Sequence, residues 1–246
     1  MVYKERTYRK NFRQSDLVHF QVVIKETDLD IGVYRKRYSP ELVKLAEKIT
    51  LKYRTQLEEY IKIHPEFLTS LQPLQVKSGA PAIARQMADA AKKAGVGPMA
   101  AVAGAVAEAV GMELLRHTRE IIIENGGDIY LKSNRKRRIG IYAGQSPFTE
   151  KIAIEIPPEL TPLGICTSSG TVGHSLSFGR ADAAIIISAN TSLADAVATA
   201  TANRVQNPED VQTALEFAIN ISGITGAVVI KHDKLAAWGN VKIVHI

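Results

Sequence analysis

The sequence is poor in cysteine and in aromatic residues, and no apolar run reaches membrane-spanning length. With 1 cysteine in 246 residues, the chain cannot form an intramolecular disulfide framework. Phe, Trp and Tyr make up 6% of the residues, and no helix-turn-helix, RNP or zinc-ligand spacing occurs, which argues against nucleic acid as the main partner. The opening MVYKERTYRKNFR lacks the apolar segment of a signal peptide, so we expect a soluble, cytoplasmic protein without membrane contact. Whether it forms a homo-oligomer is left open.

The net charge of +6 is concentrated in basic segments at residues 4–13, 35–37 and 135–138. Segments of this kind are usually solvated loops. They can also raise the local concentration of an anionic small molecule or a nucleotide near the protein surface. The residues alone do not decide between these interpretations.

The pattern of apolar residues predicts an α+β fold. Apolar residues make up 46% of the chain, enough for one large domain or two small ones, and no Pro/Ser-rich linker divides it. Alternation predicts an opening hairpin over 16–36 with its turn near 27–30, and Ser39-Pro40 predicts the start of a long helix that ends before His64-Pro65. A helical block follows over 81–117, interrupted at 95–98. We expect strands near 119–124, 128–132, 138–142, 151–156, 163–167 and 183–188, helices near 191–204 and 208–220, and a closing pair of strands, AVVIKHD and NVKIVHI.

Residues 164–202 carry the highest density of reactive groups in the chain. After the apolar run AAIIIS, Asn190, Thr191 and Ser192 offer caps for a small-residue helix in which Asp195 and Thr199 stand four residues apart on one face. Both side chains supply the hard oxygen ligands that magnesium prefers. The alternative is that Asp195 only complements the helix dipole while its neighbour packs.

Two glycine-containing turns are candidates for a phosphate or nucleotide. Ser168, Ser169 and Gly170 follow a short apolar strand, and Gly126-Gly127 lies between the β-rich runs EIIIE and DIYLK. Glycine leaves the main chain open to close approach by a ligand. Each turn is equally consistent with an ordinary strand connection, and the second one in particular with an Asn-Gly hairpin.

The order of these segments resembles the second half of the ApbE-like flavin transferases. Those proteins carry a GG-D/E segment, a V-G-I-x-x-P strand, an A-T-S-G turn and an A-D-A-x-x-T-A helix, and this chain has ENGGDIYLK, RRIGIYAGQSP, ICTSSG and SLADAVATATA in the same order. The stretch GPMAAVAGAVAEAVG is similar in placement to their K-G-x-A-x-D helix. The block GICTSSGTVGHSLSFGRADA resembles more closely a mostly archaeal and bacterial family placed beside them, for which a link to sulfur assimilation and homocysteine formation in methanogens has been suggested.

The resemblance implies a single ApbE-like domain over residues 1–246, with a T-fold-related α+β fold of mixed and antiparallel sheets packed with helices. It implies that Asp195 and Thr199 bind magnesium and that FAD or a related nucleotide is the cofactor. The residues that match flavin-contacting segments are Gly126, Gly127, Asp128, Ser168, Ser169 and Gly170.

The chain also departs from the transferase pattern. Ala103 stands where those proteins have the lysine of their K-G dipeptide, and GTVGHSLSFGRAD replaces their H-x-I-x-D-P-x-T-G segment. His174 is the nearest substitute for the missing histidine, as a general base, or it is a loop histidine that bonds backbone. Cys166 is either a small buried hydrophobe or a thiolate activated by its polar neighbours.

Two functions remain. The first is a magnesium-dependent protein of this superfamily that binds a flavin nucleotide without transferring it and that serves sulfur assimilation or homocysteine formation. The alternative is an active flavinylating enzyme, an FAD-dependent FMN transferase in which His174 or Cys166 takes part in the chemistry. The missing D-P-x-T-G segment favours the first, and the matching metal positions favour the second.

Overall fold

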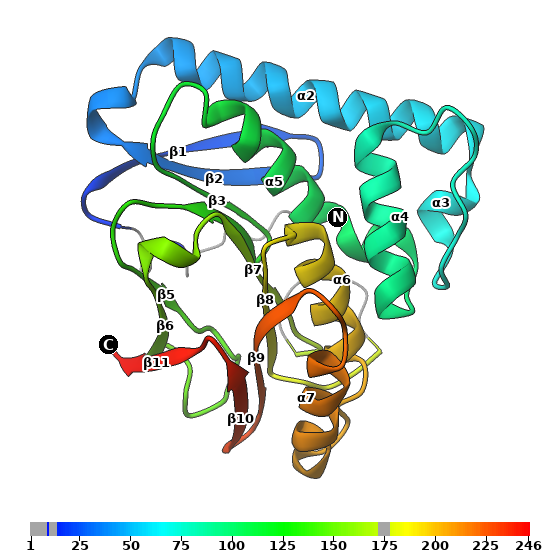
Figure 1. Ribbon diagram of the computed structural model, residues 1–246, viewed down its shortest axis with the longest axis vertical. Coiled ribbons are helices and arrows are strands. Elements are labelled where there is room, and N and C mark those ends of the chain that lie inside the picture. The colour runs from blue at the N-terminus through cyan, green and yellow to red at the C-terminus, as the bar shows by residue number, and fades with distance from the viewer. Residues whose placement is uncertain (1–8, 10–13, 172–177) are drawn as a thin grey trace.

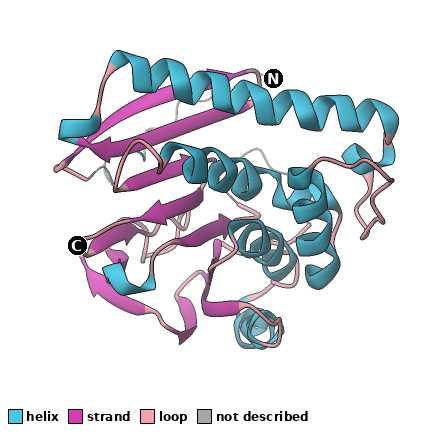
Figure 2. Cartoon of the chain, turned by 45° about the horizontal axis from the view of Figure 1, so that its top comes forward, coloured by secondary structure: helices cyan, strands magenta, loops and turns pink. Residues whose placement is uncertain are grey.

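The computed structural model describes residues 9, 14–171 and 178–246 and contains two antiparallel sheets with helices gathered over one side of the larger sheet (Figures 1 and 2). The eight-stranded sheet has the order β1 (Leu17–Ile24), β2 (Thr27–Tyr34), β3 (Ile121–Asn125), β4 (Asp128–Lys132), β7 (Leu163–Ser168), β8 (Ala183–Ser188), β9 (Ile224–Lys231) and β10 (Lys234–Gly239). The three-stranded sheet has the order β11 (Lys242–His245), β6 (Ile152–Ile156) and β5 (Arg137–Gly140).

The helices are α2 (Pro40–Ile63), α3 (Glu66–Thr69), α4 (Ala82–Ala94), α5 (Val102–Leu114), α6 (Thr191–Ala202) and α7 (Val211–Ile219). Short 3-10 turns lie at Arg35–Arg37, Pro98–Ala101, Pro158–Leu160 and Pro208–Asp210. The long helix α2 begins as its sequence predicts, because the Ser39 hydroxyl accepts a hydrogen bond from Leu42 N and Pro40 occupies the first turn.

Each face of the large sheet packs against its own hydrophobic core. Side chains alternate across a strand, so Ile121 and Ile123 of β3 face the helices, while Ile122 faces the small sheet together with Ile154 of β6. The isoleucine-rich strands are therefore buried on both faces although they are antiparallel. Among the described residues no single helix is long and apolar enough to cross a membrane, although α4 and residues 98–114, bent by 104°, pass the same test as a pair.

The structure corrects the predicted connections at both ends of the chain. The opening hairpin turns at Lys25-Glu26 and not near 27–30, with a positive φ of 52° at Lys25. The closing strands do not pair with each other: β9 pairs with β10, which the sequence pattern did not predict, and β11 pairs with β6 in the small sheet. The run KLAAWG lacks the β-branched residues that mark strands, so its pairing with β9 is set by tertiary packing.

Candidate functional site

Asp128, Cys166 and Asp195 meet on the helix-covered face of the large sheet. Asp128 begins β4, Cys166 lies on the neighbouring strand β7, and Asp195 comes from α6, which packs on β7. All three residues are buried, with exposed fractions of 6%, 0% and 8%. Thr167 N donates to Asp128 Oδ1 over 3.3 Å, which ties the end of β7 to the start of β4.

Burial in this cluster acts against ionisation. Burial raises the pKa of Asp128 well above its usual range, and the negative charges of Asp195 and Glu124 raise it further. Burial also raises the pKa of Asp195, to about 7, although hydrogen bonds from the N–H groups of Gly104 and Ala103 lower it. Neither Asp128 nor Asp195 has an ion-pair partner among the described residues.

Cys166 is fully enclosed. Its Sγ lies 3.4 Å from the carbonyl oxygen of Thr191, to which the thiol donates. Burial raises the pKa of the Cys166 thiol, and the nearby charges of Asp128 and Asp195 raise it further. This is the opposite of the shift that an activated thiolate requires, so burial favours the small buried hydrophobe of the two interpretations.

Asp195 also closes the N-terminus of α5. The cap position of that helix is Ala101, whose side chain has no acceptor, and Asp195 Oδ2 accepts instead from Gly104 N over 2.8 Å. Asn125, on the hairpin between β3 and β4, donates from Nδ2 to the Ala103 carbonyl oxygen over 3.1 Å. The metal candidate, the start of α5 and the glycine hairpin are therefore joined by direct hydrogen bonds.

The donor chemistry around Asp195 suits magnesium. Among the described residues no group of three or more His, Cys, Asp or Glu side chains is arranged to hold a metal ion. Magnesium does not need such a group, because it commonly takes one or two carboxylates and completes its octahedron with water and phosphate oxygens. Thr199 lies one helical turn beyond Asp195 and is partly exposed. The Asp195 carboxylate, the Thr199 hydroxyl and the nearby Asp128 carboxylate are hard oxygen donors of the kind that fit the ion.

The Gly126-Gly127 segment is a hairpin turn, as one of the two interpretations predicts. Asn125 pairs with Asp128 across it, and the two glycines have φ values of 70° and 107° that favour residues without a Cβ. Gly127 N donates to Glu124 Oε1 over 2.7 Å, so this N–H already has a partner. The backbone of the turn nonetheless borders the buried carboxylates.

The turn after β7 is built by hydroxyl and backbone contacts. Ser168 ends the strand, and Ser169 Oγ accepts from Thr171 N over 3.1 Å. Gly170 N donates to the carbonyl oxygen of Ala181, and a Cβ at Gly170 would lie 1.9 Å from the carbonyl oxygen of Gly179. Glycine is thus required here for close backbone packing.

Comparisons with known proteins show the family to which the chain belongs. A protein-family model described as AbpE bacteria matches residues 9–236. The chain belongs to this family. A UPF0280 protein of Methanocaldococcus jannaschii is 42% identical over 90% of each chain, and one of Methanocella arvoryzae is 46% identical over 76% of each.

Solved structures share the ApbE-like fold. The apo flavinyl transferase ApbE of Pseudomonas stutzeri matches with a TM-score of 0.56 and 13% identity over 90% of this chain and 93% of its own. The ApbE protein of Thermotoga maritima matches with a TM-score of 0.50 and 11% identity, over 91% and 96%. At these identities the likeness shows the fold, and it confirms the ApbE-like α+β architecture expected from the sequence.

The structure brings together part of the predicted set. Asp128, Cys166, Asp195 and the end of β7 are adjacent, and the hairpin glycines border them. His174 lies outside the described residues, so its expected approach to Cys166 stays a prediction.

Sequence reasoning missed Glu108. It is the only charged residue between Lys93 and Glu113, in an alanine-rich stretch, and it stands at the acidic position of the K-G-x-A-x-D pattern; both were available signals. The residue is 9% exposed, and its carboxylate accepts from Thr191 N over 3.2 Å and from Gln86 Nε2 over 2.8 Å. Burial raises the pKa of Glu108.

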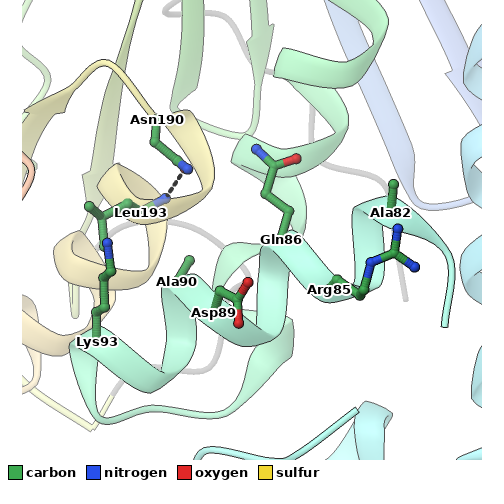
Figure 3. A pocket seen from close by; sticks show the side chains of 8 residues that line it. All are labelled: Ala82, Arg85, Gln86, Asp89, Ala90, Lys93, Asn190 and Leu193. Atoms are coloured by element: carbon green, nitrogen blue, oxygen red, sulfur yellow. Dashed lines mark hydrogen bonds between the residues drawn. The ribbon is translucent and has the colours of Figure 1, made fainter. Parts of the chain in front are cut away.

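A pocket of about 300 Å³ lies between α4 and the start of α6 (Figure 3). Arg85, Asp89 and Lys93 line it from α4, and Asn190 and Leu193 line it from the start of α6. None of the predicted site residues that the structure describes lines this pocket. The first N–H groups of α6 have partners inside the protein, including Asn190 Oδ1 for Leu193 N at 2.8 Å, so they do not offer an anion site to the pocket.

Proposed function

We propose that this protein binds FAD or a related flavin nucleotide together with magnesium. The observation that carries the proposal is the pair of buried carboxylates, Asp128 and Asp195, which lie near enough for the charge of Asp195 to raise the pKa of Asp128 and which have no ion-pair partner among the described residues. A divalent cation at this point would offset both their mutual repulsion and the cost of burying them.

In this proposal Asp195 and Thr199 hold the ion from one face of α6, and Asp128 adds negative charge from β4. Bound magnesium supplies positive charge for the nucleotide's phosphates. The glycine hairpin and the turn after β7 contact the nucleotide, through Gly126 and Gly127 on one side and Ser168, Ser169 and Gly170 on the other. Through its resemblance to the methanogen family, the protein would serve sulfur assimilation or homocysteine formation.

Calorimetric titration with FAD tests the proposal, in the presence and absence of magnesium, on the wild type and on Asp195→Ala. Loss of a metal-bound carboxylate should weaken magnesium-dependent binding by about 10-fold or more, since loss of outer-shell support alone costs that much. The exposed Asp233 is a matched control, and Asp233→Ala should bind as the wild type does. Equal binding with and without magnesium would refute the metal site, and absence of FAD binding would refute the proposal.

The alternative function is FAD-dependent FMN transfer to a protein. The matching positions of Asp195 and Thr199 favour it, because transfer needs a metal beside the pyrophosphate. Transfer also needs a base placed at the acceptor hydroxyl, and such placement contributes several orders of magnitude in rate. The segment corresponding to the transferases' H-x-I-x-D-P-x-T-G motif is shortened here, so we expect weak or absent transfer.

Incubation with FAD, magnesium and an acceptor protein distinguishes the two functions. Covalent flavin fluorescence on a denaturing gel should be weak or absent at the acceptor's position. A strong acceptor band that disappears in Asp195→Ala would favour the transferase over the binding protein.

A further inference from the structure

Helices α5 and α6 each supply the carboxylate that satisfies the other's N-terminus. Asp195 of α6 accepts from Gly104 N of α5 at 2.8 Å, and Glu108 of α5 accepts from Thr191 N of α6 at 3.2 Å. The two contacts pair positions 104 with 195 and 108 with 191, so the helices cross in opposite directions with their first turns side by side. A shift of either helix therefore breaks both contacts.

Helices α5 and α6 cross in close backbone contact. A Cβ at Gly104 would lie 2.6 Å from the Thr191 carbonyl oxygen and 2.9 Å from Asp195 Cβ. On the other side, a Cβ at Gly164 of β7 would lie 2.6 Å from Thr191 Cα. The first residue of α6, Thr191, thus lies in backbone contact with α5 on one side and with β7 on the other. Its position fixes where Asp195, one turn later, presents its carboxylate.

The Glu108 side chain binds the first turn of α6 through hydrogen bonds. Besides Thr191 N it accepts hydrogen bonds from Ser192 N and from Gln86 Nε2 of α4, the latter over 2.8 Å. A carboxylate can accept several hydrogen bonds on its two oxygens, whereas a glutamine side chain has one acceptor oxygen. Glu108 has no cationic partner among the described residues, so its contacts are with the helix N-terminus and the Gln86 amide.

We propose that Glu108 is a positioning residue for the metal site, acting through the first turn of α6 on the placement of Asp195. This rests on the proposed function, in which Asp195 binds magnesium. Glu108 touches neither the ion nor the nucleotide in this arrangement. Its removal loosens the crossing and lets the Asp195 carboxylate depart from the geometry that the ion requires, as loss of outer-shell partners does in other metal sites.

The test uses manganese alone as the probe, because free Mn²⁺ is counted directly by electron paramagnetic resonance and no flavin is needed. Titrations compare the wild type with Asp195→Ala, Glu108→Gln, Glu108→Ala and Gln86→Ala, at a temperature where circular dichroism shows each to be folded. We expect Glu108→Ala to weaken Mn²⁺ binding by about 10-fold. Glu108→Gln and Gln86→Ala should give smaller losses in the same direction. Glu113→Gln, on the same helix but bonded to Lys52 and Tyr53, should bind as the wild type does.

The outcomes distinguish the proposed metal site from the positioning role of Glu108. If the wild type does not bind Mn²⁺, or if Asp195→Ala binds equally well, the proposed metal site at Asp195 is refuted. The positioning role of Glu108 is then refuted as well. If Asp195→Ala loses binding while the folded Glu108 and Gln86 variants match the wild type, only the positioning role is overturned. Gln86 is partly exposed, so its variant decides the matter even if Glu108→Ala does not fold.

Discussion

The backbones of Gly104 and Thr191 are so close that a single methyl group does not fit between them: a Cβ at position 104 would lie 2.6 Å from the Thr191 carbonyl oxygen. Because the obstacle is backbone and not a flexible side chain, Gly104→Ala must push α5 and α6 apart. We expect a loss of about 1–3 kcal/mol in the free energy of unfolding, as for other overpacked cores.

Urea denaturation measures this change. Met112→Ala is the control on the same helix, because Met112 is 59% exposed and its truncation should alter stability by no more than about 0.5 kcal/mol. A Gly104→Ala protein as stable as the wild type would mean that the crossing of the two helices adjusts freely.

Binding of magnesium with FAD should strengthen as the pH rises. Burial raises the pKa of Asp195 to about 7, so below that pH the carboxylate is mostly protonated and the metal must displace a proton. Affinity should therefore fall by up to about 10-fold for each pH unit below the pKa of Asp195. Calorimetry between about pH 6 and about pH 8 measures the profile, and heats in buffers of different ionisation enthalpy report the released proton. A flat profile, without proton release, would mean that Asp195 is already ionised before the metal binds.

The sequence predicts where helices and strands lie better than it predicts which strands pair with one another. Ser39-Pro40 and the isoleucine-rich strands are recognisable because capping and apolar runs are local properties. The strand β10 was missed because KLAAWG has no β-branched residue, and its strand form follows from pairing with β9. The closing strands were expected together, yet β11 pairs with β6, about 90 residues earlier along the chain. Strand pairing over such a sequence distance depends on the packing of the whole structure.

The same limit applies to the site. Spacing within α6 is enough to place Asp195 and Thr199 on one face. It does not reveal that Asp195 accepts a hydrogen bond from Gly104 N, 91 residues away. Nor does it reveal that Glu108 accepts one from Thr191 N. The alternatives for Cys166 were both compatible with its neighbours in sequence, and its complete burial comes from strands and a helix that are distant in the chain.

Cys166 should react slowly with alkylating agents in the folded protein. Its side chain is fully buried, and burial together with the charges of Asp128 and Asp195 raises the pKa of its thiol. Because the thiolate is the reacting form, neutral pH leaves little of it in the folded protein. Iodoacetamide labelling followed by mass spectrometry should show modification at least about 100-fold slower than in the chain unfolded by urea. Rapid labelling of the folded protein at neutral pH would restore the activated thiolate.

Arg137 should be the most important residue of the basic segment 135–138 for stability. Its side chain is 3% exposed and bonds to Asp16 Oδ1 at 2.6 Å and to Glu120 Oε2 at 2.9 Å. Ser133 Oγ accepts from Arg137 Nε at 2.9 Å and donates to Glu120 Oε2 at 2.7 Å, which completes a buried network. Arg137→Met keeps the aliphatic stem but leaves the Glu120 carboxylate buried without its cation. We expect a loss of about 3 kcal/mol, the lower end for breaking a buried ion pair, because Asp16 is itself 32% exposed.

Arg138→Met is the matched control for this loss. The Arg138 side chain is 60% exposed, and it shares Glu155 with Lys136 and Lys242, so its charge is replaceable and its removal should change stability by no more than about 0.5 kcal/mol. Arg137→Lys should recover only part of the lost stability, because an ammonium group cannot span Asp16, Glu120 and Ser133 as the planar guanidinium does. Urea denaturation of the three variants measures the series. Equal unfolding midpoints for the two methionine variants would show that the buried network contributes no more than a surface charge.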